Sequence, residues 1–230
     1  MSLGMFWSLL NPLVMMGLLT FVFTAIISGN RIPHFGLFVL CGIIPYNFFT
    51  IAWLSGTNSL VENAHMIKRV SIPRGVIPVA AVLSNCVHLL IQVGLLLALA
   101  LLWGQMPNRF WLWLPVIWLL QVVFVCGLSL ITSSLNVCVR DTRYVVESAN
   151  MVLFWLVPIF YSFSAIPPQY AEIYLYNPVA AVVMCLRNII LEARPPVVST
   201  VLKLAGSSAA TLALGLFVFH KMQRRFYDYL

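Results

Sequence analysis

Charged side chains are scarce in this sequence: Asp, Glu, Lys and Arg make up 8% of the 230 residues, against about 25% in an ordinary soluble protein. Hydrophobic residues make up 62%, and the mean hydropathy is +0.98. A soluble chain of this composition has too few polar residues to cover its surface. The composition therefore excludes a soluble globular protein and predicts an all-α integral membrane protein.

Acidic residues are especially few, and their positions exclude several mechanisms. The six Asp and Glu residues all fall in predicted loops or at the ends of predicted spans. Transporters driven by protons or sodium ions usually need an ionisable group held inside the membrane, for which His88 is the single candidate. The sequence has no phosphate-binding G-x-x-x-x-G-K-[ST] motif, no H-E-x-x-H and no aspartate-rich pair. If the protein does work, another chain supplies the energy, and this chain is not an enzyme.

The cysteines indicate neither a metal site nor a bound cofactor. There are five of them, and they form no C-x-x-C pair and no cluster with histidine. Most fall in apolar runs, where cysteine behaves as a small hydrophobic residue. We therefore interpret them as buried packing residues.

Apolar runs long enough to cross a membrane recur along the chain. At about 20 residues per spanning helix, the chain has room for roughly five to seven spans and none for a soluble catalytic domain. Because no repeat or linker divides it, we predict a single transmembrane domain over residues 1–230. Six predicted spans cover about residues 6–27, 36–55, 76–103, 110–137, 145–163 and 200–219.

Residues 164–199, between the fifth and sixth predicted spans, are rich in proline and aromatic residues. Their apolar stretch Val179–Leu186 is too short to cross a bilayer. The sequence therefore predicts a re-entrant or interfacial segment here, on the outer side of the membrane.

The net charge of +7 is interpreted as a topology signal rather than as a nucleic-acid footprint. Six spans place both termini on one side. With the termini inside, the inner segments carry Lys68, Arg69, Arg74, Arg140, Arg143, Lys221, Arg224 and Arg225. The outer segments then carry Arg31, Arg109, Arg187, Arg194 and Lys203. The excess of basic residues on the inner side predicts that both termini are cytoplasmic.

The first predicted cytoplasmic loop contains the pattern of a capping box, Ser59-Leu60-Val61-Glu62, which predicts the start of a helix that ends before Pro73. Its apolar side would hold Leu60, Ala64, Met66, Ile67 and Val70. Its polar side would hold Glu62, His65, Lys68 and Arg69, with Arg74 following. Such a helix either rests on acidic lipid or docks a cytoplasmic partner, and the missing energy source favours docking.

The second predicted cytoplasmic loop carries Arg140-Asp141-Thr142-Arg143-Tyr144. By itself this segment is typical of a solvated span boundary, with Asp141 as the N-cap of the next helix. It is also a candidate for a second docking loop.

Polar side chains inside the third predicted span share one helix face: Asn85, His88 and Gln92 are spaced i, i+3, i+7. Such groups avoid lipid and point inward, either to join helices by hydrogen bonds or to line a conduit. In the second predicted span, Pro45 predicts a kink next to Tyr46, Asn47, Phe48 and Phe49. Aromatic platforms of this kind either pack the bundle or line the path of a sugar.

Five segments, in this order, resemble the permease subunits of type-2 ATP-binding-cassette exporters, in the branch that exports polysaccharides and polyol phosphates. They are Leu3–Pro12, Met66–Arg74 followed by Pro78, Arg140–Tyr144, Pro158–Ser162, and Asn177-Pro178 with Arg187. The resemblance covers essentially the whole chain. The segments with Pro73-Arg74 and Asn177-Pro178 favour this branch over the drug- or haem-exporting branch.

The resemblance implies a homodimer whose two six-helix halves enclose a channel for a lipid-linked glycan in a bacterial cell membrane. Two copies of a separate ATPase, which binds ATP and magnesium, would drive it, and residues 59–74 and 139–147 would dock in its clefts. The resemblance also implies aromatic channel lining, to which Tyr46, Phe48 and Phe49 are assigned.

One departure concerns the start of the chain. Family members usually carry a further segment with an amphipathic helix ahead of the motif that begins at Leu3. Here Met1 lies directly before it. We therefore expect either a start codon placed too far downstream or a protein without that element.

Two alternatives have different functions. One is a drug- or haem-exporting permease of the same superfamily. The other is a membrane enzyme acting on lipid-linked sugars, for which Glu172 or Glu192 would be recruited, although neither has a paired acid nearby.

Overall fold

The computed structural model describes residues 2–26, 32–69, 73–167, 169–170, 174, 176–223 and 226, and over these residues the chain is helical, without a β-strand. Side chains are described from Trp7 onward, apart from those of residues 8, 68 and 69. The all-α prediction is confirmed.

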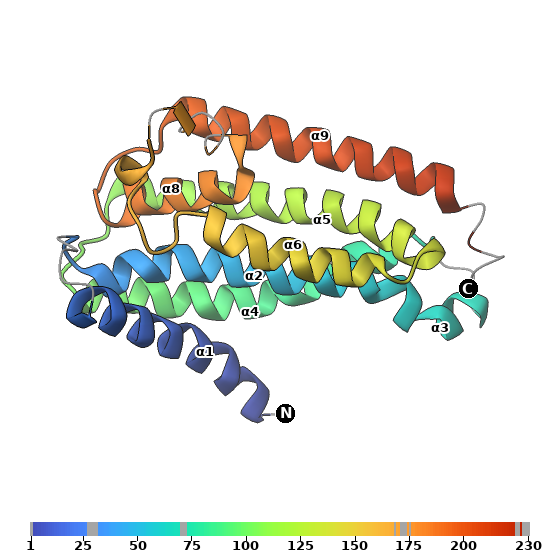
Figure 1. Ribbon diagram of the computed structural model, residues 1–230, viewed down its shortest axis with the longest axis horizontal. Helices are drawn as coiled ribbons and strands as arrows, with labels where there is room; N and C mark the ends of the chain where they lie inside the picture. Colours follow the sequence, from blue (N-terminus) through green and yellow to red (C-terminus); the bar gives the residue numbers. More distant parts are fainter. Residues whose placement is uncertain are drawn as a thin grey trace.

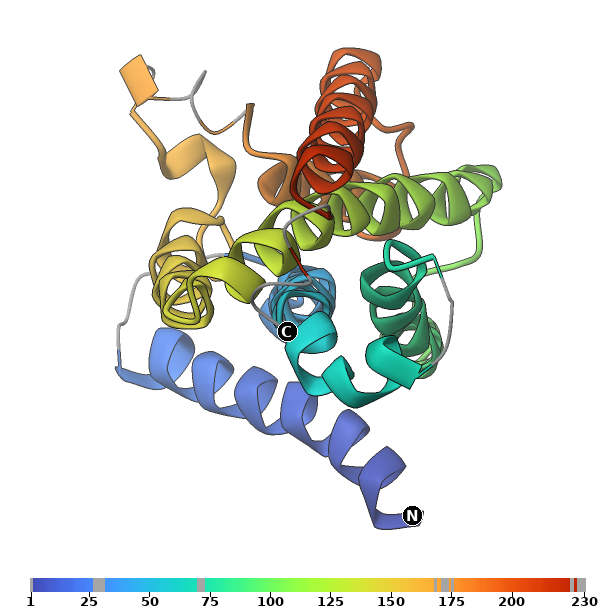
Figure 2. The same cartoon turned by 90° about the vertical axis from the view of Figure 1, so that its right-hand side faces the viewer.

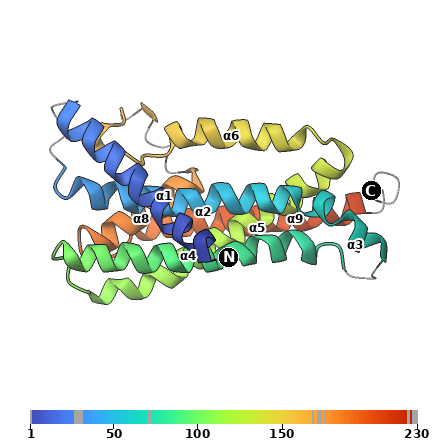
Figure 3. The same cartoon turned by 90° about the horizontal axis from the view of Figure 1, so that it is seen from below.

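Four long helices form a bundle along the long axis of the molecule (Figure 1). They are α2 (Phe35–Glu62), α4 (Val76–Leu102), α5 (Leu114–Cys138) and α9 (Val198–Met222). Two short 3-10 helices, η2 (Arg109–Trp113) and η3 (Phe163–Ala165), connect elements at one end of this bundle. α1 (Ser2–Phe21), continued by the π-helical turn η1 (Val22–Ile26), crosses α2 and α4 obliquely on the outside (Figure 3).

α2 is the centre of the bundle. Seen from the end, the other helices surround it (Figure 2), and it contacts α1, α4, α5, α6 and α8. In its most apolar 18-residue window, 78% of residues are buried, against 6% for the window in α1. The apolar runs of the sequence thus divide into one central helix and several that keep one side exposed.

Five helices are long and apolar enough to cross a membrane within the described residues: Leu9–Ile26, Phe35–Glu62, Val76–Leu102, Arg109–Cys138 and Val198–Met222. The predicted span at 145–163 is instead occupied by a shorter helix, α6 (Thr142–Leu156), of 15 residues. It ends there because Pro158 disfavours helical backbone at Val157, which is extended. The count of six spans therefore stays a prediction.

The predicted outer region contains α8 (Pro178–Ile190), which includes the whole apolar stretch Val179–Leu186. The side chain of Asn177 caps its first turn by accepting hydrogen bonds from the Val179 and Ala180 amides. Ten of its 13 residues are buried. The segments 157–167 and 191–197 lie at the same end of the bundle (Figure 1), which we call the α8 end.

The capping box predicted at residues 59–62 is wrong. α2 continues through it to Glu62, and the Ser59 hydroxyl donates back to the Gly56 carbonyl at 2.7 Å. Ser59 and Leu60 are buried in the bundle, so packing extends the helix past the local start signal. The next helix, α3 (Ala64–Arg69), begins one residue after a turn at Asn63. Likewise, α2 passes through Pro45 without interruption.

α5 and α9 meet through glycine. A Cβ atom on Gly127 would lie 2.6 Å from the Leu212 backbone nitrogen, and one on Gly215 would lie 2.5 Å from the Gly127 carbonyl oxygen. Small residues of this kind let helix backbones touch inside membranes. The contact fixes α9 closely against α5.

Candidate functional sites at the α3 end and at mid-bundle

The two predicted docking loops lie at one end of the bundle, which we call the α3 end. α3, the link from α5 to α6 and the C-terminal end of α9 meet there (Figure 1). The Arg74 guanidinium donates a hydrogen bond of 2.8 Å to the Gln223 carbonyl and so joins the first loop to α9. Segments far apart in the sequence therefore form one surface.

A pocket of about 350 Å³ lies between these loops. It is lined by Asn58, Val61, Glu62, Asn136, Arg140, Asp141, Arg143 and Tyr144. The structure thus brings Glu62 of the first loop together with Arg140, Asp141, Arg143 and Tyr144 of the second. The predicted residues His65, Pro73 and Arg74 do not line the pocket, and the side chains of Lys68 and Arg69 lie outside the described ones.

The pocket carries charges of both signs on an ordered frame. The Asn136 amide donates to the Thr57 carbonyl at 3.1 Å and so holds α5 against α2. The Arg143 Nε lies 2.9 Å from Glu147 Oε1, the one ion pair within the described residues. Asp141 occupies the N-cap position of α6, but its side chain makes no capping hydrogen bond. Tyr144 is 63% exposed, so the rim presents both charge and an aromatic face.

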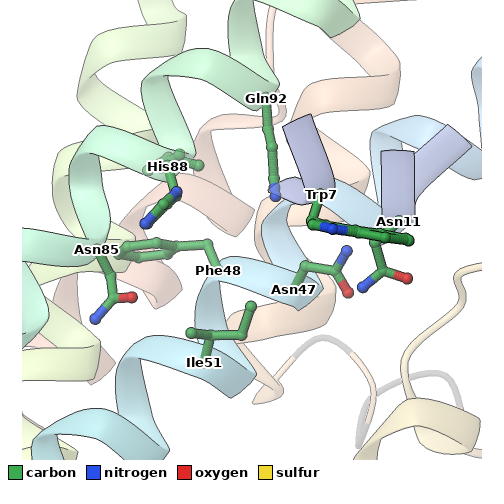
Figure 4. A pocket seen from close by; sticks show the side chains of 9 residues that line it. Trp7, Asn11, Asn47, Phe48, Ile51, Asn85, His88 and Gln92 are labelled. Atoms are coloured by element: carbon green, nitrogen blue, oxygen red, sulfur yellow. The ribbon is translucent and has the colours of Figure 1, made fainter. Parts of the chain in front are cut away.

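A second pocket, of about 220 Å³, lies near the middle of the bundle between α1, α2 and α4 (Figure 4). It is lined by Trp7, Asn11, Asn47, Phe48, Ile51, Asn85, His88, Leu89 and Gln92. Five predicted channel residues are therefore gathered here. Asn85, His88 and Gln92 share one side of α4, as their spacing predicts.

Sequence reasoning missed Trp7 and Asn11, which contribute to the mid-bundle pocket from α1. Both lie inside the segment Leu3–Pro12 that carries the family resemblance, and they are four residues apart on one helix face. A polar and an aromatic side chain at this spacing in an apolar run was a usable signal.

Tyr46 and Phe49 lie elsewhere. Tyr46 is 5% exposed, and its hydroxyl donates a hydrogen bond to the Asn150 carbonyl on α6. Phe49 is 1% exposed and stacks on Phe124 of α5, with ring centroids 6.2 Å apart. The aromatic stretch therefore splits: Asn47 and Phe48 border the pocket, and Tyr46 and Phe49 pack against α5 and α6.

Arg187, which the sequence placed among the outer charges, is buried in α8 with 6% exposure. Its guanidinium donates hydrogen bonds to the carbonyls of Ile159 at 2.7 Å, Phe38 at 3.3 Å and Tyr161 at 3.5 Å. It therefore ties the bend after α6 to both α2 and α8.

Over the described residues, no group of three or more His, Cys, Asp and Glu side chains is placed to hold a metal ion. Predicted site residues therefore gather at two pockets, one with charged lining residues and one without Asp, Glu, Lys or Arg.

This multi-pass helical chain belongs to the ABC-2 type transporter family, whose model matches residues 1–191. It is thus a transporter permease, and the family assignment made from the sequence is confirmed.

Among named relatives, an O-antigen export system permease protein RfbA of Klebsiella pneumoniae is 32% identical over 82% of this chain and 73% of its own length. An RfbA of Myxococcus xanthus is 26% identical over 97% of this chain and 86% of its own length. The polysialic acid transport protein KpsM of Escherichia coli is 23% identical over 82% of this chain and 74% of its own length.

Proposed function

We propose that this chain is the membrane-spanning subunit of an ATP-driven exporter that moves a lipid-linked polysaccharide out of the cytoplasm. O-antigen, capsular and teichoic-acid-like glycans are the cargo classes we consider. The names of the relatives support this proposal, because they include O-antigen export and polysialic acid transport proteins. Family membership supports the role of permease rather than of enzyme.

The observation that carries the proposal is the convergence of the two loops at the α3 end. The whole of α4 and α5 separates residue 62 from residues 140–144 in sequence, yet these residues border one charged pocket. A surface built from two loops and open to solvent suits a protein partner better than a small apolar ligand. We assign that partner as a separate ATPase.

ATP and magnesium are bound by that ATPase, since this chain carries no phosphate-binding loop. We propose that two copies of the permease and two of the ATPase form the exporter. Glu62, His65, Lys68, Arg69, Pro73, Arg74, Arg140, Asp141, Arg143 and Tyr144 are assigned to docking. Asn47, Phe48, Asn85, His88 and Gln92 are assigned to the glycan path, and Tyr46 and Phe49 to the packing behind it.

For topology we propose six crossings in a single domain over residues 1–230, with both termini at the cytoplasmic face of a bacterial inner or plasma membrane. α6, with 15 residues, is about 22 Å long at 1.5 Å per residue, short of a hydrocarbon core of about 30 Å. The non-helical residues after it complete this crossing, which is the fifth along the chain. Non-helical backbone at that depth needs protein partners, and Arg187 supplies one to the Ile159 carbonyl at 2.7 Å.

We assign α8 as a re-entrant helix that enters from the outer face and returns to it. Its 13 residues are too few to cross the membrane. Burial of ten of them within the bundle supports a place inside the protein rather than on the membrane surface.

The drug- or haem-exporting alternative is disfavoured by the named relatives, which are polysaccharide exporters. The lipid-linked-sugar enzyme is disfavoured by family membership. Of its two candidate acids, Glu192 is exposed at the α8 end, and Glu172 lies outside the described residues.

The test is deletion of this gene in a bacterium that makes the cognate surface glycan. We expect surface polysaccharide to disappear and lipid-linked glycan to accumulate inside the cell, with both reversed by the gene supplied in trans. Sensitivity to a panel of drugs serves as the control and should not change. Unchanged surface polysaccharide together with altered drug sensitivity would favour the other branch.

A further inference from the structure

Three side chains in the mid-bundle pocket have polar atoms that make no hydrogen bond to the described part of the chain. They are Asn11, Asn47 and His88, which border the pocket (Figure 4); Asn11 and His88 are exposed and Asn47 is half-buried. Asn47 and His88 lie near the middle of α2 (Phe35–Glu62) and of α4 (Val76–Leu102). At that depth in a membrane, unsatisfied polar groups are expensive and point to function.

The chemistry of the pocket is neutral. None of its nine lining residues is Asp, Glu, Lys or Arg. Amide side chains offer both donors and acceptors, and an imidazole offers one of each when neutral. This set matches a ligand with several hydroxyl groups, which also donate and accept. It does not match a phosphate, for which arginine and lysine are the usual partners.

Aromatic faces complete the pocket. The Trp7 side chain is 60% exposed, and Figure 4 shows its indole beside Asn11 and Asn47. Phe48 approaches from α2 on the other side of Asn47. Sugar rings stack the C–H groups of one face on such aromatic surfaces while their hydroxyls reach outward to polar side chains. Amides beside the exposed Trp7 ring are therefore a suitable lining for a pyranose.

The size of the pocket matches one sugar ring. Its volume is about 220 Å³, which is room for about seven water molecules at ~30 Å³ each. A single pyranose fits that space, and the neighbouring rings of a polymer would extend beyond it.

We propose that the pocket between α1, α2 and α4 binds one neutral pyranose ring of the glycan, through the Asn11, Asn47 and His88 side chains and the Trp7 face. This proposal rests on the proposed export function and adds a discrete sugar site to it. A site for one ring holds a polymer one residue at a time. The same site then suits each neutral sugar of a repeating glycan in turn.

The test measures binding of methyl α-D-glucopyranoside, methyl α-D-mannopyranoside and methyl α-D-galactopyranoside by saturation-transfer NMR. The sample is the full chain with its ATPase in lipid nanodiscs, and inorganic phosphate is the comparison ligand. We expect weak binding of at least one glycoside and none of phosphate. Asn47→Leu and His88→Leu should each weaken glycoside binding by about fivefold, the effect of one lost hydrogen bond.

Ser84→Leu is the matched control, because Ser84 is exposed on the same helix as His88, lies outside the pocket and bonds only the Ala81 carbonyl of its own helix. It should bind like the wild type. If Asn47→Leu reduces the folded yield, Asn11→Leu tests the site instead, because Asn11 is an exposed residue of α1.

Glycoside binding that all three pocket variants leave intact would overturn the proposal, as would binding of phosphate in preference to every glycoside. Absence of glycoside binding by the wild type would overturn it as well. Surface polysaccharide measured in the same strains separates this failure from failure of the export function. If export is intact but glycoside binding does not depend on the pocket residues, only the proposed sugar site is wrong. If export continues without this chain, the proposed export function is wrong.

Discussion

The guanidinium carbon of Arg187 lies 3.4 Å from the centre of the Phe38 ring, and the same guanidinium donates to the Phe38 carbonyl oxygen at 3.3 Å. Arg187 thereby holds α8 to α2 through both the side chain and the backbone of one residue. The same guanidinium also donates to the Ile159 and Tyr161 carbonyls in the bend after α6. No acid is paired with this buried cation within the described residues, so carbonyl dipoles and an aromatic face take that place.

We expect Arg187→Lys to destabilise the protein by about 1.5–3 kcal/mol, because a lysine ammonium cannot reproduce the planar fork of donors that reaches several carbonyls. Thermal unfolding in detergent measures the effect. Arg194→Lys, at an exposed position of the α8 end, is the control and should unfold like the wild type. Equal unfolding temperatures for Arg187→Lys and the wild type would contradict the assigned role.

Gly127→Ala should destabilise the protein by about 1–3 kcal/mol, because a methyl group there meets the α9 backbone at 2.6 Å. Gly94→Ala provides the comparison within α4. Nothing lies within 4 Å of a Cβ at Gly94, and alanine favours helix by about 1 kcal/mol over glycine. Denaturation of both variants should therefore give effects of opposite sign. Stabilisation by Gly127→Ala to the same extent as by Gly94→Ala would show that the α5–α9 contact is not close.

Docking is tested with Tyr144→Ala combined with Arg140→Glu. Exposed charge pairs contribute only about 0–1 kcal/mol each, but a buried aromatic anchor in an interface contributes about 2 kcal/mol or more. We expect the double variant to bind the ATPase at least about tenfold more weakly in a pull-down titration. Arg109→Glu, at the α8 end, should bind normally. Full ATPase binding by the double variant would place the docking surface elsewhere.

Topology is tested by labelling from outside the cell in a background without the five native cysteines. Glu172→Cys should react with an impermeant maleimide, and Asp141→Cys should react only after the membrane is opened. The proposed six crossings predict this pattern, since residue 172 follows α6 and residue 141 precedes it. The reverse pattern would show that the chain has the opposite orientation, with the α3 end outside the cytoplasm.

Residues that line the glycan path and residues that only pack the bundle should respond differently in two measurements, the yield of folded dimer and the export per dimer. Phe49→Ala should lower the yield, at about 3–5 kcal/mol for a buried phenylalanine, with export per dimer unchanged. His88→Leu should lower export per dimer at normal yield, because His88 is exposed in the pocket. Normal export per dimer in His88→Leu would assign α4 to packing as well.

Much of the architecture could be predicted because hydropathy reports burial in lipid directly. The predicted spans at 76–103 and 110–137 agree closely with α4 and with η2 plus α5. The predicted span 145–163 missed the end of α6 at Leu156, although Pro158 was a signal for it, since proline restricts the residue before it. The end of α2 was not predictable, because burial of Ser59 and Leu60 by neighbouring helices overrides the local cap.

The sites show the same division between local and tertiary information. Tyr46 and Phe49 are three residues apart and share one helix face, whereas Asn47 and Phe48 turn towards Ile51, so helical geometry alone separates them. The burial of Arg187 was not predictable, because the carbonyls that accept from it come from segments up to 149 residues away. That Glu62 and residues 140–144 border the same pocket likewise depends on where α2 and α5 end.

The glycine contact between α5 and α9 also governs how these helices move. Where Gly127 and Gly215 cross, backbone atoms meet directly, so no change of side-chain rotamer lets the two helices slip at that point. α5 and α9 are therefore expected to travel as one rigid body. Because Arg74 holds the far end of α9 through Gln223, we expect a displacement of the loop beside α3 to move α9 and α5 together.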